Sequence, residues 1–540
     1  MLNIENTFAN PAFIANTGYE APHRFLIMGL GESGVAMAKW CLRNGASVRL
    51  VDTRDRSTFS ERQYAWLDEL KIAGLKDIQF GPLSDELLVD IDVIGISPGL
   101  SPIQEPTESF LVKARKARID IWSEIEFFAR AITALGRMAQ AAESSYKSAV
   151  LAITGTNGKT TTTALTGQLC ERAGKKVAVA GNISPAALDK LMNCLDTADQ
   201  IEDMPDIWVL ELSSFQLVYT HTLNPIAATV LNITQDHLDW HGDMQAYAEA
   251  KAKIFGPDTI CILNRDDSLV MNLISDEQKA EKSIVTFGSN RPDEQGAFGI
   301  EHDLRAGGID WLVWAEVDED IEPKPKRRRK SAAIEEDEPL RLKRLIPADA
   351  LRIRGRHNAL NALAALALAR AADLPMNVLL HGLRDYHGEP HRVQSVAIVN
   401  DVEYVDDSKG TNVGATVAAL NGLGSNESGK KIWLIAGGDG KGQDFSPLRE
   451  PALRFVKGVF LIGKDGAAIG EAIGNEIPST MSGNLEAAVK AAAQQAQSGD
   501  LVLLSPACAS FDQFKDYVAR AQVFVGEVEE LGMRFEGVQA

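Results

Sequence analysis

The sequence predicts an α/β protein built from three domains. Its 540 residues are too many for a single hydrophobic core. Apolar, strand-like runs alternate with helical stretches along most of the chain, a pattern typical of mostly parallel sheets covered by helices. Glycine-rich turns follow two of these runs, near residues 29–34 and 155–158. We expect the domains to comprise residues 1–147, 148–354 and 355–540.

The first domain is predicted to be Rossmann-like. The segment RFLIMGLGESGVAMAKWCLRNGASVRLVD reads as strand, turn, helix and strand, with Gly29, Gly31 and Gly34 in a G-x-G-x-x-G pattern and Asp52 at the end of the second strand. Taken alone, the pattern indicates an NAD site. However, Glu32 places a carboxylate in the loop where a pyrophosphate would lie, and a uridine-diphosphate sugar fits the same crevice equally well. Both ligands remain open at this point.

The second domain begins with the most informative segment of the chain, AVLAITGTNGKTTTT at residues 149–163. An apolar strand runs into G-x-x-G-K-T and then into a predicted helix over residues 161–172. This arrangement directs backbone N–H groups, a helix N-terminus and the Lys159 ammonium at one anion, and it places the Thr160 hydroxyl beside a magnesium ion that bridges phosphates. The loop is shorter than the usual Walker sequence, because Ile153 stands where a further glycine would be. We therefore expect a central, P-loop ATPase-like parallel sheet that binds ATP.

Further strands are predicted in both remaining domains. In the central domain they cover residues 177–182, 207–213, 227–234 and 259–264. An alanine-rich helix over residues 354–374 is expected to open a Rossmann-like third domain, with strands at 402–408, 431–438, 458–463 and 501–507. Between them, residues 316–345 combine acidic blocks, prolines and the basic run from Lys324 to Lys330 without aromatic residues, which indicates a flexible, solvated insertion.

Composition narrows the class of protein. A net charge of −19 argues against nonspecific nucleic-acid binding, which depends on neutralising phosphates. Five scattered cysteines have neither metal-site nor disulfide spacing. The N-terminus lacks a signal pattern, and no apolar run reaches the roughly 18 residues of a membrane span. We expect a cytoplasmic protein, without membrane insertion and without a nucleic-acid partner.

Polar residues at strand ends are candidates for chemistry. Glu211 ends the apolar strand IWVLE, the position of an acid that holds magnesium opposite a phosphate loop. The segment NITQDHLDWHG gathers two acids and two histidines after another strand, and we select His237 as the residue that faces the site. Lys251 and Lys253, on a predicted helix, would ordinarily be surface charges. Cys508 has no histidine nearby and is predicted to be a buried small residue rather than a nucleophile.

Several of these segments together resemble the Mur ligase family. The resemblance covers nearly the whole chain and rests on GTNGKTT, ELSSFQL, the NxTxDHxD pattern, GRHNALNALAA, the dipeptide at 391–392, DDSKGTNVGAT, GGDGKGQDF and SPACASFDQF. ELSSFQL and the last three segments of this list, DDSKGTNVGAT, GGDGKGQDF and SPACASFDQF, are most similar to the members that add D-glutamate to UDP-N-acetylmuramoyl-L-alanine. The resemblance implies an ATP-dependent ligase that proceeds through an acyl phosphate, with two Mg²⁺ ions and small-molecule substrates.

The resemblance also assigns residues to each ligand. It implies catalytic roles for Lys159, His237 and Lys251, with Lys251 carbamylated, and metal ligands at Thr160, Glu211, His237 and Lys251. The implied ATP-binding residues are Gly155, Thr156, Asn157, Gly158, Lys159, Thr160, Thr161, Asn264, His357, Arg392 and Asp407. The implied contacts of the UDP substrate are Ser33, Thr53, Arg54, Gly99, Asn182, Ser213 and Gln216. The implied contacts of D-glutamate are Lys409, Thr411, Lys441, Ser510, Phe511 and Tyr517.

Two other functions compete with this interpretation. One is a Mur ligase that adds a different amino acid, which would need another pocket in the third domain. The other is an NAD-dependent oxidoreductase built on the first glycine loop. Glu32, the stretch between residues 130 and 147 and the 316–345 segment depart from the family pattern. We expect a monomer.

Overall fold

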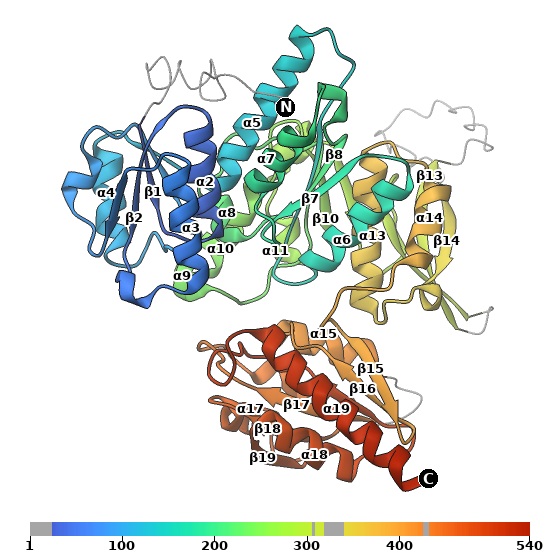
Figure 1. Cartoon of the computed structure of the whole chain (residues 1–540). Helices are drawn as coiled ribbons and strands as arrows, with labels where there is room; N and C mark the ends of the chain where they lie inside the picture. The colour runs from blue at the N-terminus through green and yellow to red at the C-terminus, as the bar shows by residue number, and fades with distance from the viewer. Residues whose placement is uncertain (1–23, 305–307, 318–339, 425–430, 540) are drawn as a thin grey trace, which may run out of the picture.

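We describe the protein from a computed structural model, which covers residues 24–304, 308–317, 340–424 and 431–539 (Figure 1). Within these residues the strands form three sheets, each with helices packed on it. The three-domain α/β fold predicted from the sequence is therefore confirmed. The basic run from Lys324 to Lys330 lies outside the described residues.

The N-terminal sheet has the strand order β3-β2-β1-β4-β5, and its neighbouring strands are parallel. Its strands are β1 (Arg24–Met28), β2 (Ser47–Asp52), β3 (Asp77–Phe80), β4 (Val93–Ile96) and β5 (Asp120–Trp122), and its helices are α2 (Glu32–Arg43), α3 (Glu61–Ile72), α4 (Thr107–Lys116) and α5 (Glu124–Ala141). The glycine loop between β1 and α2 is tight. A Cβ atom at Gly34 would lie only 1.9 Å from the Gly29 carbonyl oxygen, so the first turn of α2 can approach the loop only with glycine there.

The central sheet has the order β14-β13-β12-β11-β10-β9-β6-β8-β7. Its strands are β6 (Ala149–Thr154), β7 (Val177–Gly181), β8 (Ile207–Glu211), β9 (Ala227–Val230), β10 (Ile260–Asn264), β11 (Ile284–Phe287), β12 (Phe298–Asp303), β13 (Ile309–Val317) and β14 (Leu340–Pro347). The strands from β6 to β12 pair in parallel, whereas β13 is antiparallel to both of its neighbours, β12 and β14. The prediction of a loop over residues 316–345 is wrong at both ends, because its first and last residues belong to the β13–β14 pair.

The helices of the central region include two that the sequence assigned to the third domain. They are α6 (Lys159–Arg172), α7 (Ala187–Thr197), α8 (Ser214–Val218), α9 (Leu238–His241), α10 (Met244–Ala252), α11 (Ser268–Met271), α12 (Asp276–Glu281), α13 (Arg356–Ala371) and α14 (Met376–Asp385). Helices α13 and α14 pack on α6, and the buried alanines and leucines of α13 share one apolar core with β6 and β10 (Figure 1). This packing differs from the predicted boundary at residue 355, and we propose that the third domain begins after α14.

The C-terminal sheet has the order β15-β16-β20-β17-β18-β19, and only β15 is antiparallel to its neighbour. Its strands are β15 (Gln394–Val399), β16 (Val402–Asp406), β17 (Ile432–Gly437), β18 (Val456–Ile462), β19 (Ser479–Gly483) and β20 (Leu501–Leu504), and its helices are α15 (Val413–Leu423), α16 (Arg449–Phe455), α17 (Gly466–Ile473), α18 (Leu485–Gln495) and α19 (Tyr517–Gln539).

The domain junctions differ in character. The N-terminal and central domains share an apolar core, in which the ring of Phe128 on α5 lies 5.1 Å from that of Trp208 on β8. The C-terminal domain has its own cores and lies beside the other two (Figure 1). No helix in the described part of the chain is both long and apolar enough to span a membrane.

Candidate active site

The phosphate loop joins β6 to α6 in a conformation that requires glycine. Gly158 caps α6 with a φ of +84°, and a Cβ atom there would lie 2.5 Å from the Asn361 side-chain oxygen. Lys159 opens the helix, and its Nζ donates hydrogen bonds to the carbonyl oxygens of Gly155 (2.8 Å) and Thr156 (2.9 Å). Burial lowers the pKa of Lys159 from its usual value. The loop therefore directs a desolvated lysine and a helix N-terminus to the same place, as an anion site requires.

Two further cations reach this loop from the C-terminal side. Arg392 Nη2 and Lys409 Nζ each donate a hydrogen bond of 3.1 Å to the Thr160 hydroxyl. Burial, and then the charge of Arg392, lower the pKa of Lys409 to about 8. Lys409 was predicted among the D-glutamate contacts, whereas the structure places its ammonium against the Thr160 hydroxyl of the phosphate loop.

A cavity of about 200 Å³ lies next to the loop, between the central and C-terminal domains. Of the predicted ATP-binding residues, those that line it are Asn157, Gly158, Thr161, Asn264, His357, Arg392 and Asp407. Gly155, Thr156, Lys159 and Thr160 lie in the adjoining loop and at the start of α6. The cavity is also lined by Leu231 and Phe287, which are not among the residues predicted from the sequence. Their apolar side chains suit the flat face of a nucleobase.

Burial perturbs two of the ionisable groups that line this cavity. The pKa of His357 falls to about 4, so its imidazole is neutral at physiological pH. The pKa of Asp407 rises to about 7, although its carboxylate accepts a 2.7 Å hydrogen bond from Ser505. Perturbed groups of this kind concentrate at functional sites.

Glu211 ends β8 as predicted, and it is 2% exposed. Its Oε1 accepts a 2.8 Å hydrogen bond from the Asn182 side chain. Its Oε2 is buried and has no hydrogen-bond partner among the described residues. A buried carboxylate oxygen left without a donor is costly, and a cation would satisfy it.

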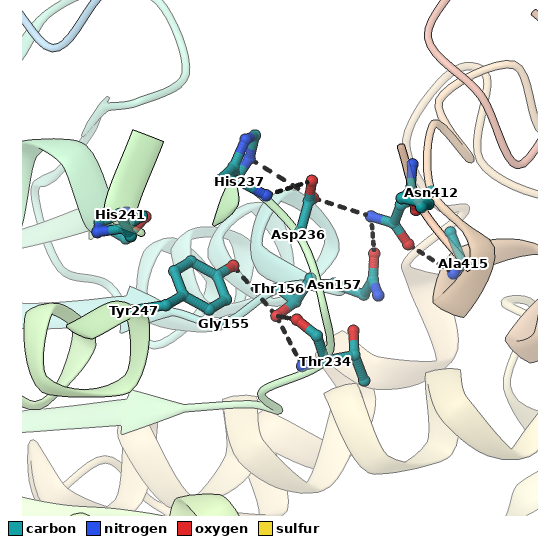
Figure 2. A network of polar contacts seen from close by, with 12 residues as sticks. Gly155, Thr156, Asn157, Thr234, Asp236, His237, His241, Tyr247, Asn412 and Ala415 are labelled. Atoms are coloured by element: carbon teal, nitrogen blue, oxygen red, sulfur yellow. Dashed lines mark hydrogen bonds and ion pairs between the residues drawn. The ribbon is translucent and has the colours of Figure 1, made fainter. Parts of the chain in front are cut away.

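His237 belongs to a network that crosses the domain junction (Figure 2). Its φ is +55°, its ring lies 4.7 Å from that of Phe215, and its Nε2 lies 3.5 Å from Asp236 Oδ2. Burial lowers the pKa of His237, which favours the neutral imidazole that metals bind. Asn412 Nδ2 reaches from the C-terminal domain to Asn157 Oδ1 (3.0 Å) and Asp236 Oδ2 (3.4 Å). Asn412 is not among the residues predicted from the sequence, although it lies in DDSKGTNVGAT.

Lys251, on α10, is only 1% exposed, unlike an ordinary helix-surface lysine. Its Nζ donates to the Gly155 carbonyl (3.0 Å) and lies 4.4 Å from the centre of the Tyr247 ring. Burial, followed by the charge of Lys159, lowers the pKa of Lys251 well below its usual value. Over the described part of the chain, no group of three or more His, Cys, Asp or Glu side chains is arranged to hold a metal ion. Any divalent ion here would therefore need ligands from a modified residue, water or phosphate.

A second cavity, of about 580 Å³, lies between the N-terminal and central domains. Of the predicted UDP-substrate contacts, those that line it are Ser33, Thr53, Arg54, Gly99, Asn182 and Gln216. Ser213 does not line it but caps α8, and its side chain accepts a hydrogen bond from the Gln216 backbone N–H. Glu32, which departs from the family pattern, accepts a 2.7 Å hydrogen bond from Ser184 across this cavity.

The loops that carry the predicted D-glutamate contacts meet at the ends of the C-terminal strands. Lys409 Nζ lies 5.5 Å from the centre of the Tyr517 ring, and the Thr411 backbone N–H donates to the Lys409 carbonyl (2.9 Å). The loops of Lys441 and Ser510 are joined by a pair of backbone hydrogen bonds between Asp439 and Ala509.

Two consecutive side chains of the second of these loops differ in exposure. Ser510 is buried and Phe511 is 70% exposed. Burial raises the pKa of the nearby Cys508 to about 12, which leaves its thiol unreactive.

Comparison with known proteins identifies the family. The family model for the Mur ligase MurD-like N-terminal domain matches residues 23–122, that for the Mur ligase middle domain matches 153–369, and that for the Mur ligase glutamate ligase domain matches 391–508. A protein of Cupriavidus metallidurans named UDP-N-acetylmuramoylalanine--D-glutamate ligase is 55% identical over 521 residues, which is 95% of this chain and 98% of the relative. The chain belongs to the Mur ligase family.

Another relative agrees with this assignment, and two solved structures are similar in fold. A Mur ligase of the same name from Paraburkholderia xenovorans is 55% identical over 94% of this chain and 96% of its own. The crystal structure of MurF from Acinetobacter baumannii covers 93% of each chain at a TM-score of 0.54 and 16% identity. That of MurF ligase from Thermotoga maritima in complex with ADP covers 96% of this chain and 95% of its own, at a TM-score of 0.51 and 17% identity. At such identities the two structures support the fold alone.

Proposed function

We propose that this Mur ligase joins D-glutamate to UDP-N-acetylmuramoyl-L-alanine at the expense of ATP, as a step in peptidoglycan precursor synthesis. The names of the 55% identical relatives support the substrates. The structural observation that carries the proposal is the meeting of Lys159, Arg392 and Lys409 at the phosphate loop. Three cations around one loop suit the transfer of a phosphoryl group, whose charge must be neutralised.

The chemistry follows from the poor reactivity of a carboxylate as an acyl donor. The carboxylate of the L-alanyl group attacks the γ-phosphorus of ATP, and the bond to ADP breaks, which leaves an acyl phosphate. The amine of D-glutamate then attacks the acyl carbon, phosphate leaves and the amine loses a proton. Lys159, Arg392 and Lys409 stabilise the charge on the transferring group, while Asp407 and Asn264 bind the nucleotide.

The residues present fit two magnesium ions. The unpartnered Oε2 of Glu211 and the hydroxyl of Thr160 would hold the first, and His237 and Lys251 the second. Magnesium, when bound, neutralises the phosphate oxygens. A bare ammonium at Lys251 would repel a metal, whereas a buried lysine with a lowered pKa can add carbon dioxide to its amine, release a proton and become a carbamate ligand.

The incoming amino acid is assigned to the C-terminal domain. D-glutamate carries two carboxylates, so it needs cations and hydroxyl donors. We assign them to Lys409, Thr411, Lys441 and Ser510, with Phe511 and Tyr517 beside them. The joined loops of Lys441 and Ser510 support this set. We further propose that the enzyme acts as a monomer in the cytoplasm.

The test is an amino-acid panel assayed for phosphate release. With ATP, Mg²⁺ and UDP-N-acetylmuramoyl-L-alanine present, phosphate should appear only when D-glutamate is added, and the dipeptide product should be detected by mass spectrometry. Equal use of L-glutamate or meso-diaminopimelate would assign the chain to another ligase of the family. Hydride transfer to NAD without phosphate release would overturn the ligase proposal itself.

A further inference from the structure

Helices α2 and α5 of the N-terminal domain pack against α7 of the central domain (Figure 1). Polar contacts connect the domains at both ends of this contact. Glu32 accepts a hydrogen bond from Ser184 just before α7 begins, and Arg43 forms a 2.7 Å ion pair with Asp196 at its far end. Only the Glu32 end adjoins the cavity assigned to the UDP substrate.

A carboxyl group is buried at the same end of α7. Glu124, the first residue of α5, is 1% exposed, and its Oε1 accepts a 2.6 Å hydrogen bond from the backbone N–H of Leu188. Its Oε2 is buried and unpartnered in the described part of the chain. The N-cap residue of α7 is Ala186, which has no side-chain acceptor for the first N–H groups of the helix. Glu124 therefore supplies, from another domain, the cap that α7 lacks.

The position of Glu124 is itself fixed. The preceding residue, Ser123, donates its backbone N–H to the Tyr219 carbonyl (2.9 Å), and its hydroxyl lies 2.8 Å from that of Thr220. The next turn of α5 packs on β8 through Phe128. Glu124 thus projects from a rigid helix start and not from a mobile loop.

The segment that α7 holds in place has two functional contacts. Residues 181–186 run from β7 to α7, and Gly181, Asn182, Ser184 and Ala186 line the cavity assigned to the UDP substrate. The backbone N–H of Asn182 donates to the Glu211 carbonyl (2.6 Å), and its side chain donates to Glu211 Oε1 (2.8 Å). A shift of this segment would therefore alter the cavity wall and the orientation of Glu211 together.

We propose that Glu124 is a positioning residue for the UDP substrate: by capping α7 across the domain junction it fixes residues 181–186, and through them the cavity wall and Glu211. The proposal rests on the proposed function. Glu124 does not line the cavity, so it acts through the Leu188 N–H and not by touching the substrate.

The test measures binding of UDP-N-acetylmuramoyl-L-alanine by calorimetry, without ATP or magnesium, so that the readout is independent of turnover. Glu124→Ala leaves a buried N–H group without an acceptor, and we expect its affinity for the UDP substrate to fall about tenfold. Glu124→Gln keeps an acceptor for Leu188 and should bind within about twofold of the wild type. The matched control is Asp196→Asn, which removes the ion pair at the other end of α7 and should also bind within about twofold.

Each outcome discriminates. A wild type that does not bind the UDP substrate would refute the proposed function. A wild type that binds, with unchanged affinity in Glu124→Ala, would refute the positioning role alone. Equal weakening in Asp196→Asn would refute it too, because it would point to loosening of the whole junction. Affinity for a non-hydrolysable ATP analogue verifies that each variant is folded. If Glu124→Ala does not fold, Ser184→Ala takes its place. Wild-type affinity of Ser184→Ala for the UDP substrate would overturn the idea that residues 181–186 need to be fixed.

Discussion

Replacement of Glu124 by glutamine should stabilise the protein relative to the wild type, and this advantage should grow as the pH rises. Burial raises the pKa of Glu124 from 4.5 to about 8, with smaller contributions from the charges of Asp189 and Glu32. Between these two values the folded protein keeps this carboxyl protonated, whereas the unfolded chain releases the proton. Unfolding is therefore favoured increasingly as the pH rises through this window. Glutamine does not titrate, so the stability of the variant does not decrease through this proton release.

The size of the effect follows from the difference in pKa. Each pKa unit corresponds to about 1.4 kcal/mol. The free energy of unfolding of the wild type therefore falls by about 3 kcal/mol by pH 7, and by about 5 kcal/mol once the pH exceeds the pKa of the folded state. Below about pH 4.5 the carboxyl is protonated in both states and the loss vanishes. In the protonated wild type and in the glutamine variant alike, one polar group of this side chain is buried without a partner. Any difference in stability between the two proteins that arises from this group does not change with pH.

The assay is differential scanning calorimetry of both proteins at about pH 5 and about pH 8. At about 2–4 °C per kcal/mol for domains of this size, the advantage of Glu124→Gln in Tm should grow by several degrees between the two conditions. Because the constant offset cancels, the change with pH isolates the titration. A difference in Tm that is the same at both pH values would refute the buried, high-pKa carboxyl.

Three further substitutions test the proposed chemistry. Lys159→Ala should lower turnover at least about 10²-fold in a folded protein, since a pre-positioned charge on the transferring group contributes several kcal/mol, and near-normal turnover would remove Lys159 from the site. Lys251→Ala should be inactive and partly rescued by short carboxylic acids, with incorporation of labelled bicarbonate by the wild type as the direct measurement; an unmodified amine in an active, metal-bound crystal would contradict the carbamate. Lys441→Ala should raise the KM for D-glutamate at least about tenfold while that for ATP stays within about twofold, and an unchanged dependence on D-glutamate would move the amino-acid site elsewhere.

Local signals in the sequence were sufficient for many of the parallel strands, the phosphate loop and the acid that ends β8. The helix expected at residues 161–172 is α6, and the strand expected at 207–213 is β8. These succeed because a short apolar run bounded by polar or glycine-containing turns specifies its own conformation. Strand β14 escaped prediction because a polar, charged edge strand such as LRLKRLIP resembles a solvated loop.

Contacts between distant segments could not be predicted. Lys251 lies on a helix whose sequence gives no sign of burial, and it is buried only because the phosphate loop and Tyr247 cover it. The bonds from Arg392 and Lys409 to Thr160 join residues more than two hundred positions apart. Likewise, nothing in the sequence around Glu124 indicates that it caps a helix of the next domain. Such roles depend on tertiary packing, which periodicity does not encode.

The two domain junctions differ in the kind of contact that holds them together. The junction between the N-terminal and central domains, which holds the cavity assigned to the UDP substrate, has an apolar core that includes the Phe128–Trp208 contact. Burial of such rings makes this junction rigid. The C-terminal domain instead contacts the phosphate loop through hydrogen bonds to Thr160 and Asn157, each worth about 0.5–1.5 kcal/mol. A nucleotide phosphate offers Arg392 and Lys409 a charged acceptor in place of a hydroxyl, and charge-assisted bonds are roughly twice as strong. Nucleotide binding can therefore replace the contacts that Arg392 and Lys409 make with Thr160, while the cavity assigned to the UDP substrate stays fixed. The Thr160 hydroxyl, beside Lys159, is then free for its proposed role as a magnesium ligand.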